Sequence, residues 1–240
     1  MPEFGPGASC YTKPMATFGM LHGAWHDPSC WDLVTEHLED LGHSATTPDL
    51  PLHDPSAGYE QRIRPAIEAL EGSDGPVVVV AHSQSSALGP LVAVSRPVSL
   101  LIYLCPRMGS LEPPPGAPEP FRKSIPFPSA RPDGTTAWDP ETAIEVMYPR
   151  LPPERAMALA EHLRPMAMPP GDYPLQAHPN VPTALAYGAE DELFEPAFQR
   201  FMAEELLGID PIELQSGHFP MVEDPVAVAE LLDRLAGDLD

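Results

Sequence analysis

Three side chains in this sequence make up the set that nucleophilic acyl transfer requires, and they occur in the order serine, acid, histidine. Ser83 follows the apolar run that starts at Val77, Asp191 lies three residues beyond Gly188, and His218 lies in a Ser-Gly-His-Phe-Pro segment. Such a reaction needs a nucleophile, a base that touches it and a group that orients the base. We therefore predict Ser83 as the nucleophile, His218 as the base and Asp191 as the acid.

Both the acid and the nucleophile have neighbours of the same chemistry. Glu190 and Glu192 flank Asp191 and could supply the acid in its place. Ser85 carries a second hydroxyl, but only Ser83 stands at the corner where a buried apolar strand gives way to a helix-compatible segment.

The corner itself departs from the usual pattern for a serine nucleophile. In a G-x-S-x-G turn the serine is lifted above the sheet, and the glycines are small because strand and helix approach closely there. Here Ala81 and Ser85 take the two glycine positions. Since alanine and serine are the smallest replacements, we expect a strained but formed turn. Pro90 is expected inside the following helix, where it would kink the helix, and we have no functional account of it.

Backbone N–H groups near the serine could stabilise a developing oxyanion. One would come from Gln84, at the start of the helix after Ser83, and the other from Ala24, in the turn after the first strand. His22, Trp25 and Phe219 are predicted substrate contacts, with packing as the alternative for His22 and Trp25.

Apolar strands alternate with amphipathic helices along most of the chain, which is typical of a parallel sheet with helices on both faces. We predict an α/β fold with a doubly wound, mainly parallel sheet of about six strands. The six expected strands cover residues 16–21, 43–47, 77–81, 98–104, 181–187 and 209–214.

The predicted organisation has three parts. Residues 1–14 form a flexible arm, residues 15–105 and 180–240 form the core, and residues 106–179 form an inserted cap, or lid. The insertion contains 18 of the 34 prolines and shows two short helical patterns but no convincing strand. It is nearly balanced in charge, with seven basic and nine acidic residues, which could let the entrance accept an acidic substrate.

Composition excludes several classes of partner. A formal charge of −22 argues against binding to nucleic acid or to anionic membranes. The sequence contains no apolar run near 18 residues that would cross a bilayer and no pattern of a signal peptide. The three cysteines are unpaired in spacing and predict a reducing, cytoplasmic location. No metal-ligand spacing occurs, so we expect no metal, and the oligomeric state is not indicated.

The motifs resemble the α/β-hydrolase superfamily, and within it the small esterases that include plant methylesterases and hydroxynitrile lyases. The segments that carry the resemblance are Leu-His-Gly-Ala-Trp at 21–25, Pro-Asp-Leu-Pro at 48–51, Leu-Ile-Tyr-Leu-Cys at 101–105, Glu-Asp at 190–191, Pro-Ala-Phe-Gln-Arg at 196–200 and Gly-His at 217–218. The resemblance implies a Ser-His-Asp hydrolase without a cofactor, which cleaves a small or medium hydrophobic ester or thioester through an acyl-enzyme.

Two other functions remain open at this stage. A lyase or other tailoring enzyme could use His218 as the base for an elimination, and a non-catalytic ligand-binding relative could keep the fold alone. Hydroxynitrile lyases of this branch carry a lysine after the catalytic histidine and a threonine after the first-strand histidine. This chain has Phe219 and Gly23 there, so the resemblance does not extend to cyanohydrin cleavage.

Overall fold

The computed structural model describes residues 15–107, 113–122 and 125–239. The predicted arm at residues 1–14 lies outside the described residues.

The core is a six-stranded sheet in which every pair of neighbouring strands is parallel. The strand order is β2-β1-β3-β4-β7-β8, which confirms the predicted fold class. The strands are β1 (Thr17–Leu21), β2 (Ser44–Thr46), β3 (Val77–His82), β4 (Leu100–Leu104), β7 (Thr183–Gly188) and β8 (Ile212–Leu214).

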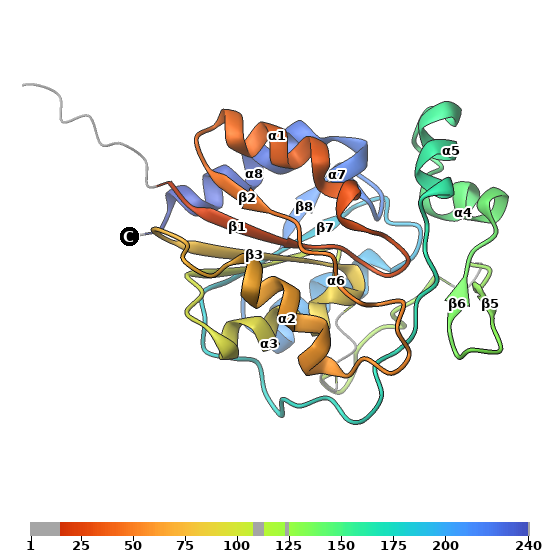
Figure 1. Cartoon of the computed structure of the whole chain (residues 1–240), viewed down its shortest axis with the longest axis horizontal. Helices are drawn as coiled ribbons and strands as arrows, with labels where there is room; N and C mark the ends of the chain where they lie inside the picture. Colours follow the sequence, from red (N-terminus) through yellow and green to blue (C-terminus); the bar gives the residue numbers. More distant parts are fainter. Residues whose placement is uncertain (1–14, 108–112, 123–124, 240) are drawn as a thin grey trace, which may run out of the picture.

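Strand β3 explains why the sheet is covered on both faces. All six of its residues are buried, so neither face can stay in contact with water. Val78 and Val80 pack on the side of α1 (Asp32–Asp40) and α8 (Pro225–Gly237). Val77, Val79 and Ala81 pack on the opposite side, against α2 (Tyr59–Ala69) and α3 (Gly89–Ser95). Figure 1 shows these two helical layers above and below the sheet.

Two helical segments begin at an aspartate–proline pair. Asp27 caps a short 3-10 helix, Pro28–Trp31, which leads into α1, and Asp224 caps α8. Near the site, α6 (Pro196–Phe201) continues as a π-helical turn, Met202–Leu207, and α7 (Pro220–Glu223) follows the His218 loop.

Pro90 does not kink a helix, contrary to our expectation. The segment after Ser83 is first a 3-10 helix, Ser83–Ala87, and α3 begins only at Gly89. Pro90 therefore stands in the first turn of α3, where the missing N–H would have had no partner in the helix.

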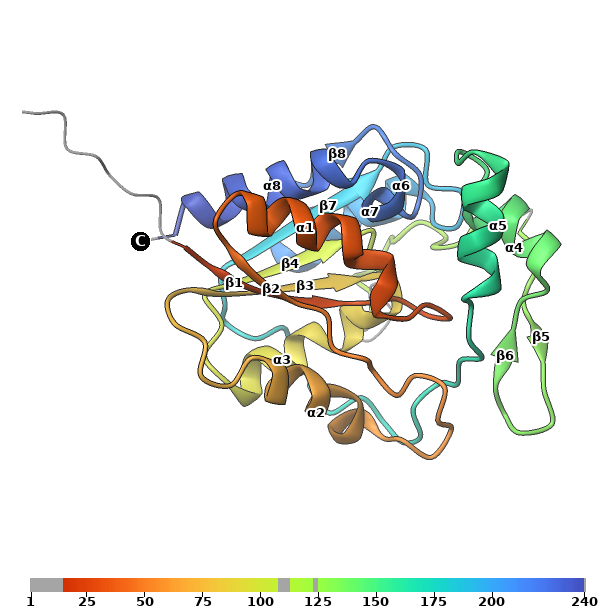
Figure 2. The same cartoon turned by 45° about the horizontal axis from the view of Figure 1, so that its top comes forward.

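The insertion between β4 and β7 contains α4 (Pro140–Met147) and α5 (Pro153–Glu161), as expected, and also a small hairpin that was not predicted. The hairpin pairs β5 (Ser129–Ala130) with β6 (Thr136–Ala137). All four elements lie beyond the carboxyl ends of the parallel strands (Figure 2), the edge at which open α/β sheets bind ligands. That they act as a lid stays a prediction.

No helix among the described residues is both long and apolar enough to cross a membrane. Cys30 and Cys105 are free and buried. The cytoplasmic location inferred from the cysteines stays a prediction.

Candidate active site

Ser83 occupies a sharp corner at the carboxyl end of β3. Its φ is 50°, in the left-handed region that side chains with a Cβ rarely adopt. Its carbonyl accepts a hydrogen bond from the backbone N–H of Arg107 at 3.1 Å. Strain of this kind costs about 1–3 kcal/mol and persists only where the surroundings hold it, as they do at many active sites.

The two residues that replace glycine at this corner are accommodated in different ways. Ala81 fits because α3 presents Gly89 to it: a Cβ at Gly89 would lie 2.9 Å from the Ala81 Cβ and 2.8 Å from Leu101 Cδ1. The Ser85 hydroxyl donates to the backbone carbonyl of His22 at 2.5 Å. Ser85 thus joins the corner to the loop after β1.

The three predicted catalytic side chains meet at this corner. His218 Nε2 lies 2.9 Å from Ser83 Oγ, and His218 Nδ1 lies 2.8 Å from Asp191 Oδ2. His218 is 1% exposed and Asp191 is fully buried, whereas Ser83 is 8% exposed and lines a cavity. Because a carboxylate only accepts hydrogen bonds, Nδ1 carries the proton, and the Nε2 lone pair faces the Ser83 hydroxyl.

Asp191 is held by the chain immediately after it. Its Oδ1 accepts the backbone N–H groups of Leu193 at 2.9 Å and Phe194 at 2.8 Å. Its Oδ2 accepts from the side-chain amide of Gln199, in α6, at 3.0 Å. Four donors, counting His218, therefore hold the carboxylate in place. Gln199 was not predicted as a site residue, because its amide reaches Asp191 only through the packing of α6.

Neither alternative acid contacts His218 in the structure. Glu190 is exposed and pairs with Arg150. Glu192 is half-buried, and burial is the largest cause of a pKa raised above the ordinary glutamate value, with Glu223 and Asp191 adding to it.

The two residues predicted to supply oxyanion N–H groups lie at the cavity beside Ser83. Ala24 and Gln84 both line it, and neither N–H group donates to a backbone carbonyl of another element among the described residues. Gly23 allows this approach, since a Cβ there would lie 2.7 Å from His82 Nδ1. Trp25 follows with a φ of 61° and anchors the loop through its indole, which donates to Thr136.

Of the three predicted substrate contacts, only Trp25 lines the cavity. His22 is fully buried, and its Nε2 accepts the backbone N–H of Leu50 at 3.1 Å. Phe219 is buried too, with its ring stacked on His26 at 4.6 Å and edge-on to His218 at 4.8 Å. The prediction of His22 and Phe219 as substrate contacts is therefore corrected: both pack behind the site and hold its loops.

Two further histidines, His26 and His82, support the same loops. His26 Nδ1 donates to the Ala24 carbonyl at 2.8 Å, and its Nε2 accepts from the Tyr148 hydroxyl at 2.7 Å. Burial lowers the pKa of His26 to about 4, so the ring is neutral at pH 7. His82 Nε2 donates to the His218 carbonyl at 2.9 Å, and burial holds the pKa of His82 well below its ordinary value.

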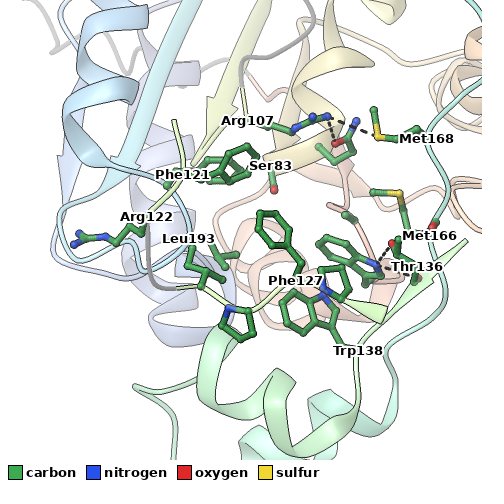
Figure 3. Close-up of a pocket in the computed structure, with 17 residues that line it drawn as sticks. Ser83, Arg107, Phe121, Arg122, Phe127, Thr136, Trp138, Met166, Met168 and Leu193 are labelled. Carbon is green, nitrogen blue, oxygen red and sulfur yellow. Dashed lines mark hydrogen bonds between the residues drawn. The ribbon is translucent and has the colours of Figure 1, made fainter. Parts of the chain in front are cut away.

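The cavity at Ser83 has a volume of about 220 Å³ and is walled mainly by apolar side chains. Figure 3 shows the Ser83 hydroxyl directed into it, with Phe127, Trp138 and Leu193 around it. Its polar lining residues are Ser83, Gln84, Arg107, Arg122 and Thr136. Apolar walls with a few convergent polar groups are typical of small-molecule sites.

A metal ion would have to compete with the hydrogen bonds just described. Ligand atoms of Cys105, Asp191 and His218 lie within 4.8 Å of one another. However, the His218–Asp191 hydrogen bond and the backbone donors already use these atoms, and burial raises the pKa of the Cys105 thiol well above its ordinary value. A thiolate ligand is therefore disfavoured. That the protein uses no metal or cofactor stays a prediction.

Comparison with known proteins agrees with this fold. Residues 20–231 match the model of the alpha/beta hydrolase family. The chain belongs to that family. It is 30% identical to methylesterase 9 of Arabidopsis thaliana over 92% of this chain and 97% of the relative. It is also 26% identical to pyrethroid hydrolase of Sphingobium wenxiniae, over 90% of this chain and 86% of the relative.

A solved structure shows the same fold. The crystal structure of the methylesterase protein MES16 from Arabidopsis superposes with a TM-score of 0.72 at 21% identity, covering 94% of this alpha/beta hydrolase and 100% of that chain. The resemblance to the small-esterase branch is thereby confirmed, and the relatives support an esterase-type hydrolase.

Proposed function

We propose that this protein is a serine hydrolase that cleaves a small or medium ester through an acyl-enzyme on Ser83. The observation that carries the proposal is the unbroken chain of hydrogen bonds from Asp191 through His218 to the Ser83 hydroxyl at the cavity. The names of the relatives, methylesterase and pyrethroid hydrolase, agree with ester chemistry.

In the acylation step, Ser83 Oγ attacks the ester carbonyl while His218 Nε2 takes its proton. Asp191 keeps the proton of His218 on Nδ1 and stabilises the imidazolium that forms. The negative charge on the carbonyl oxygen is received by the N–H groups of Ala24 and Gln84. When the carbon–oxygen bond of the leaving alcohol breaks, His218 returns the proton to the alcohol.

Deacylation repeats these steps with water. His218 Nε2 takes a proton from water as the water oxygen attacks the acyl carbon, and the bond to Ser83 Oγ breaks with return of that proton to Ser83. The carboxylic acid then leaves. The cavity of about 220 Å³ suits a small acyl or alcohol group, and its apolar walls favour a hydrophobic one.

Turnover of short 4-nitrophenyl esters tests the proposal. Ser83→Ala should lower kcat by at least about 10³-fold, because the nucleophile is gone. Ser85→Ala is a matched control, since it removes a hydroxyl two residues away that bonds to the His22 carbonyl and not to His218. This control should still form an acyl-enzyme on Ser83. Activity that survives in Ser83→Ala would refute the proposal.

The same experiment separates the alternatives predicted from the sequence. An elimination that uses His218 as the base would survive Ser83→Ala and be lost in His218→Ala. A non-catalytic protein would turn over no ester in either the wild type or the variants.

A further inference from the structure

Arg107 brings a positive charge to the edge of the catalytic cavity. It follows β4, and its backbone N–H holds the Ser83 carbonyl. Its guanidinium donates from Nη1 to the side-chain carbonyl of Gln84 at 2.8 Å and contacts Met168 sulfur at 3.8 Å. Figure 3 shows these two contacts beside Ser83. Both partners are uncharged.

The charge of Arg107 has no acidic partner in the described part of the chain. Among the described residues, no carboxylate forms an ion pair with Arg107 and no acidic side chain lines the catalytic cavity. Burial lowers the pKa of Arg107 somewhat, but an arginine stays protonated at neutral pH. A partly buried guanidinium whose remaining N–H groups donate to none of the described residues is a ready site for a planar anion.

Arg107 also stands between two cavities. A second cavity of about 340 Å³ is lined by Arg107 and Phe121, which it shares with the catalytic cavity, and by several prolines. Glu119 lines this second cavity and forms no ion pair with Arg107. A ligand that extends from Ser83 towards the second cavity therefore passes the guanidinium.

Arg122 is the other arginine that lines the catalytic cavity, and it contacts the backbone of the acid loop. Arg122 Nε donates to the backbone carbonyl of Asp191 at 2.7 Å, which ties it to the acid loop. In Figure 3 its guanidinium points away from Ser83. Of the two arginines that line the catalytic cavity, Arg107 is therefore the one that is not tied to the acid loop, and Arg122 serves as the comparison.

We propose that Arg107 binds a carboxylate of the substrate, so that the enzyme prefers esters that carry a free carboxylate beside the scissile ester, such as half-esters of dicarboxylic acids. This proposal rests on the proposed ester hydrolysis at Ser83. The chain as a whole carries a charge of −22, which repels anions at long range, so local attraction by a cation would be needed to hold such a substrate.

Two matched pairs of substrates test the proposal, one with the carboxylate in the acyl group of the ester and one with the carboxylate in the alcohol group. The first compares 4-nitrophenyl hydrogen glutarate with 4-nitrophenyl pentanoate, which places the carboxylate on the acyl side. The second compares 4-acetoxybenzoate with 4-methylphenyl acetate, which places it on the alcohol side. For each pair, the ratio of kcat/KM for the anionic ester to kcat/KM for the neutral ester is measured.

In Arg107→Met, the ratio for at least one pair should fall about ten- to a hundredfold, the range for losing one hydrogen-bonded charge partner. Arg107→Lys should keep part of the ratio, because it keeps the charge but loses the planar fork. Arg122→Met should lower kcat/KM equally for the anionic and the neutral ester of a pair, and so leave the ratio unchanged. A ratio that stays unchanged in Arg107→Met for both pairs overturns the proposal.

An equal fall in kcat/KM for the anionic and the neutral ester in Arg107→Met would also overturn the proposal. That result would mean that Arg107 only supports the side chain of Gln84. Calorimetric binding of the same half-esters to Ser83→Ala and to the double variant Ser83→Ala/Arg107→Met separates this inference from the proposed function. Weaker binding to the double variant supports the carboxylate site even if Ser83→Ala retains turnover. Equal binding refutes the site while leaving the role of Ser83 intact.

Discussion

Two sides of the same cavity differ in how firmly their side chains are held. The sheet side, formed by Ser83, Asp191, His218 and their loops, is buried, and each polar group that would do chemistry has a partner at hydrogen-bond distance. The insertion side, formed by lining residues 121–168, offers mainly apolar walls, and its Phe127 is 81% exposed.

This difference suggests that the sheet side carries out the reaction and that the insertion side selects the substrate. Residues on the sheet side stand at the ends of parallel strands, where register fixes them: His82 pairs with Leu104 and Gly188 pairs with Leu214. Residues on the insertion side are set by loops and by a hairpin whose strands are only two residues long. We therefore expect substitutions on the sheet side to change kcat or stability strongly, and those on the insertion side to change KM.

The largest effect should come from Asp191→Asn. An amide at this position donates to His218 in place of accepting, so Nδ1 loses its proton and Nε2 can no longer take one from Ser83. In serine proteases the corresponding change lowers kcat about 10⁴-fold. Glu190→Gln is the matched control and should stay within about twofold of the wild type, because Glu190 pairs with Arg150 at the surface. Equal losses in the two variants would contradict the role given to Asp191.

The second effect concerns the close approach of β3 and α3. Gly89→Ala places a methyl group 2.9 Å from the Ala81 Cβ and 2.8 Å from Leu101 Cδ1, which should lower the free energy of unfolding by about 1–3 kcal/mol. Adding Ala81→Gly should restore part of this loss, as urea unfolding of the four proteins in a double-mutant cycle would show. Additive losses would mean that the two positions do not share the space.

The third effect is a pH dependence of stability. The pKa of His26 is about 4 in the fold, against an ordinary 6.5. Between these values the unfolded chain binds a proton that the folded chain does not, so stability falls as the pH drops from 6.5 to 4. The slope from this residue is at most about 1.4 kcal/mol per pH unit. His82 adds to it in the same direction.

His26→Gln should flatten this dependence, since glutamine can donate to Ala24 and accept from Tyr148 without titrating. Urea midpoints measured from pH 4.5 to 6.5 would show it. His162→Gln, at an exposed position, serves as the control. An unchanged slope in His26→Gln would show that His26 is not buried in its neutral form.

The smallest effect should appear on the insertion side. Phe127→Ala removes part of the cavity wall from a side chain that is 81% exposed. It should raise KM about two- to fivefold with kcat unchanged. This pattern is expected when binding of the substrate and of the transition state weakens equally. Thermal unfolding should stay the same as in the wild type. A loss of kcat would place Phe127 with the sheet side and break the comparison.

The same contrast explains what the sequence could predict. The apolar run from Val77 and the order of Ser83, Asp191 and His218 are local signals, and a parallel sheet brings their strand ends to one edge. Gln199 and His26 left no such signal, because their roles arise from contacts with Asp191 and Tyr148 that only the packed chain makes.

The errors have physical causes of the same kind. Pro90 was expected inside a helix because the sequence does not show that a 3-10 turn precedes α3. Phe219 was expected at the substrate, yet its ring stacks on His26. In the sequence, Arg107 was only one of the seven basic residues of the insertion. Whether a described carboxylate pairs with it depends on which side chains surround it in the folded chain.

The Asp191–His218–Ser83 array is expected to form an acyl-enzyme. Acid-quench of the enzyme mixed with 4-nitrophenyl butyrate, followed by intact-mass and peptide mass spectrometry, tests it directly. We expect a butyryl group at Ser83, on the peptide that contains this residue, and none in Ser83→Ala. Turnover in Ser83→Ala, or an acyl group on another residue during turnover, would contradict it.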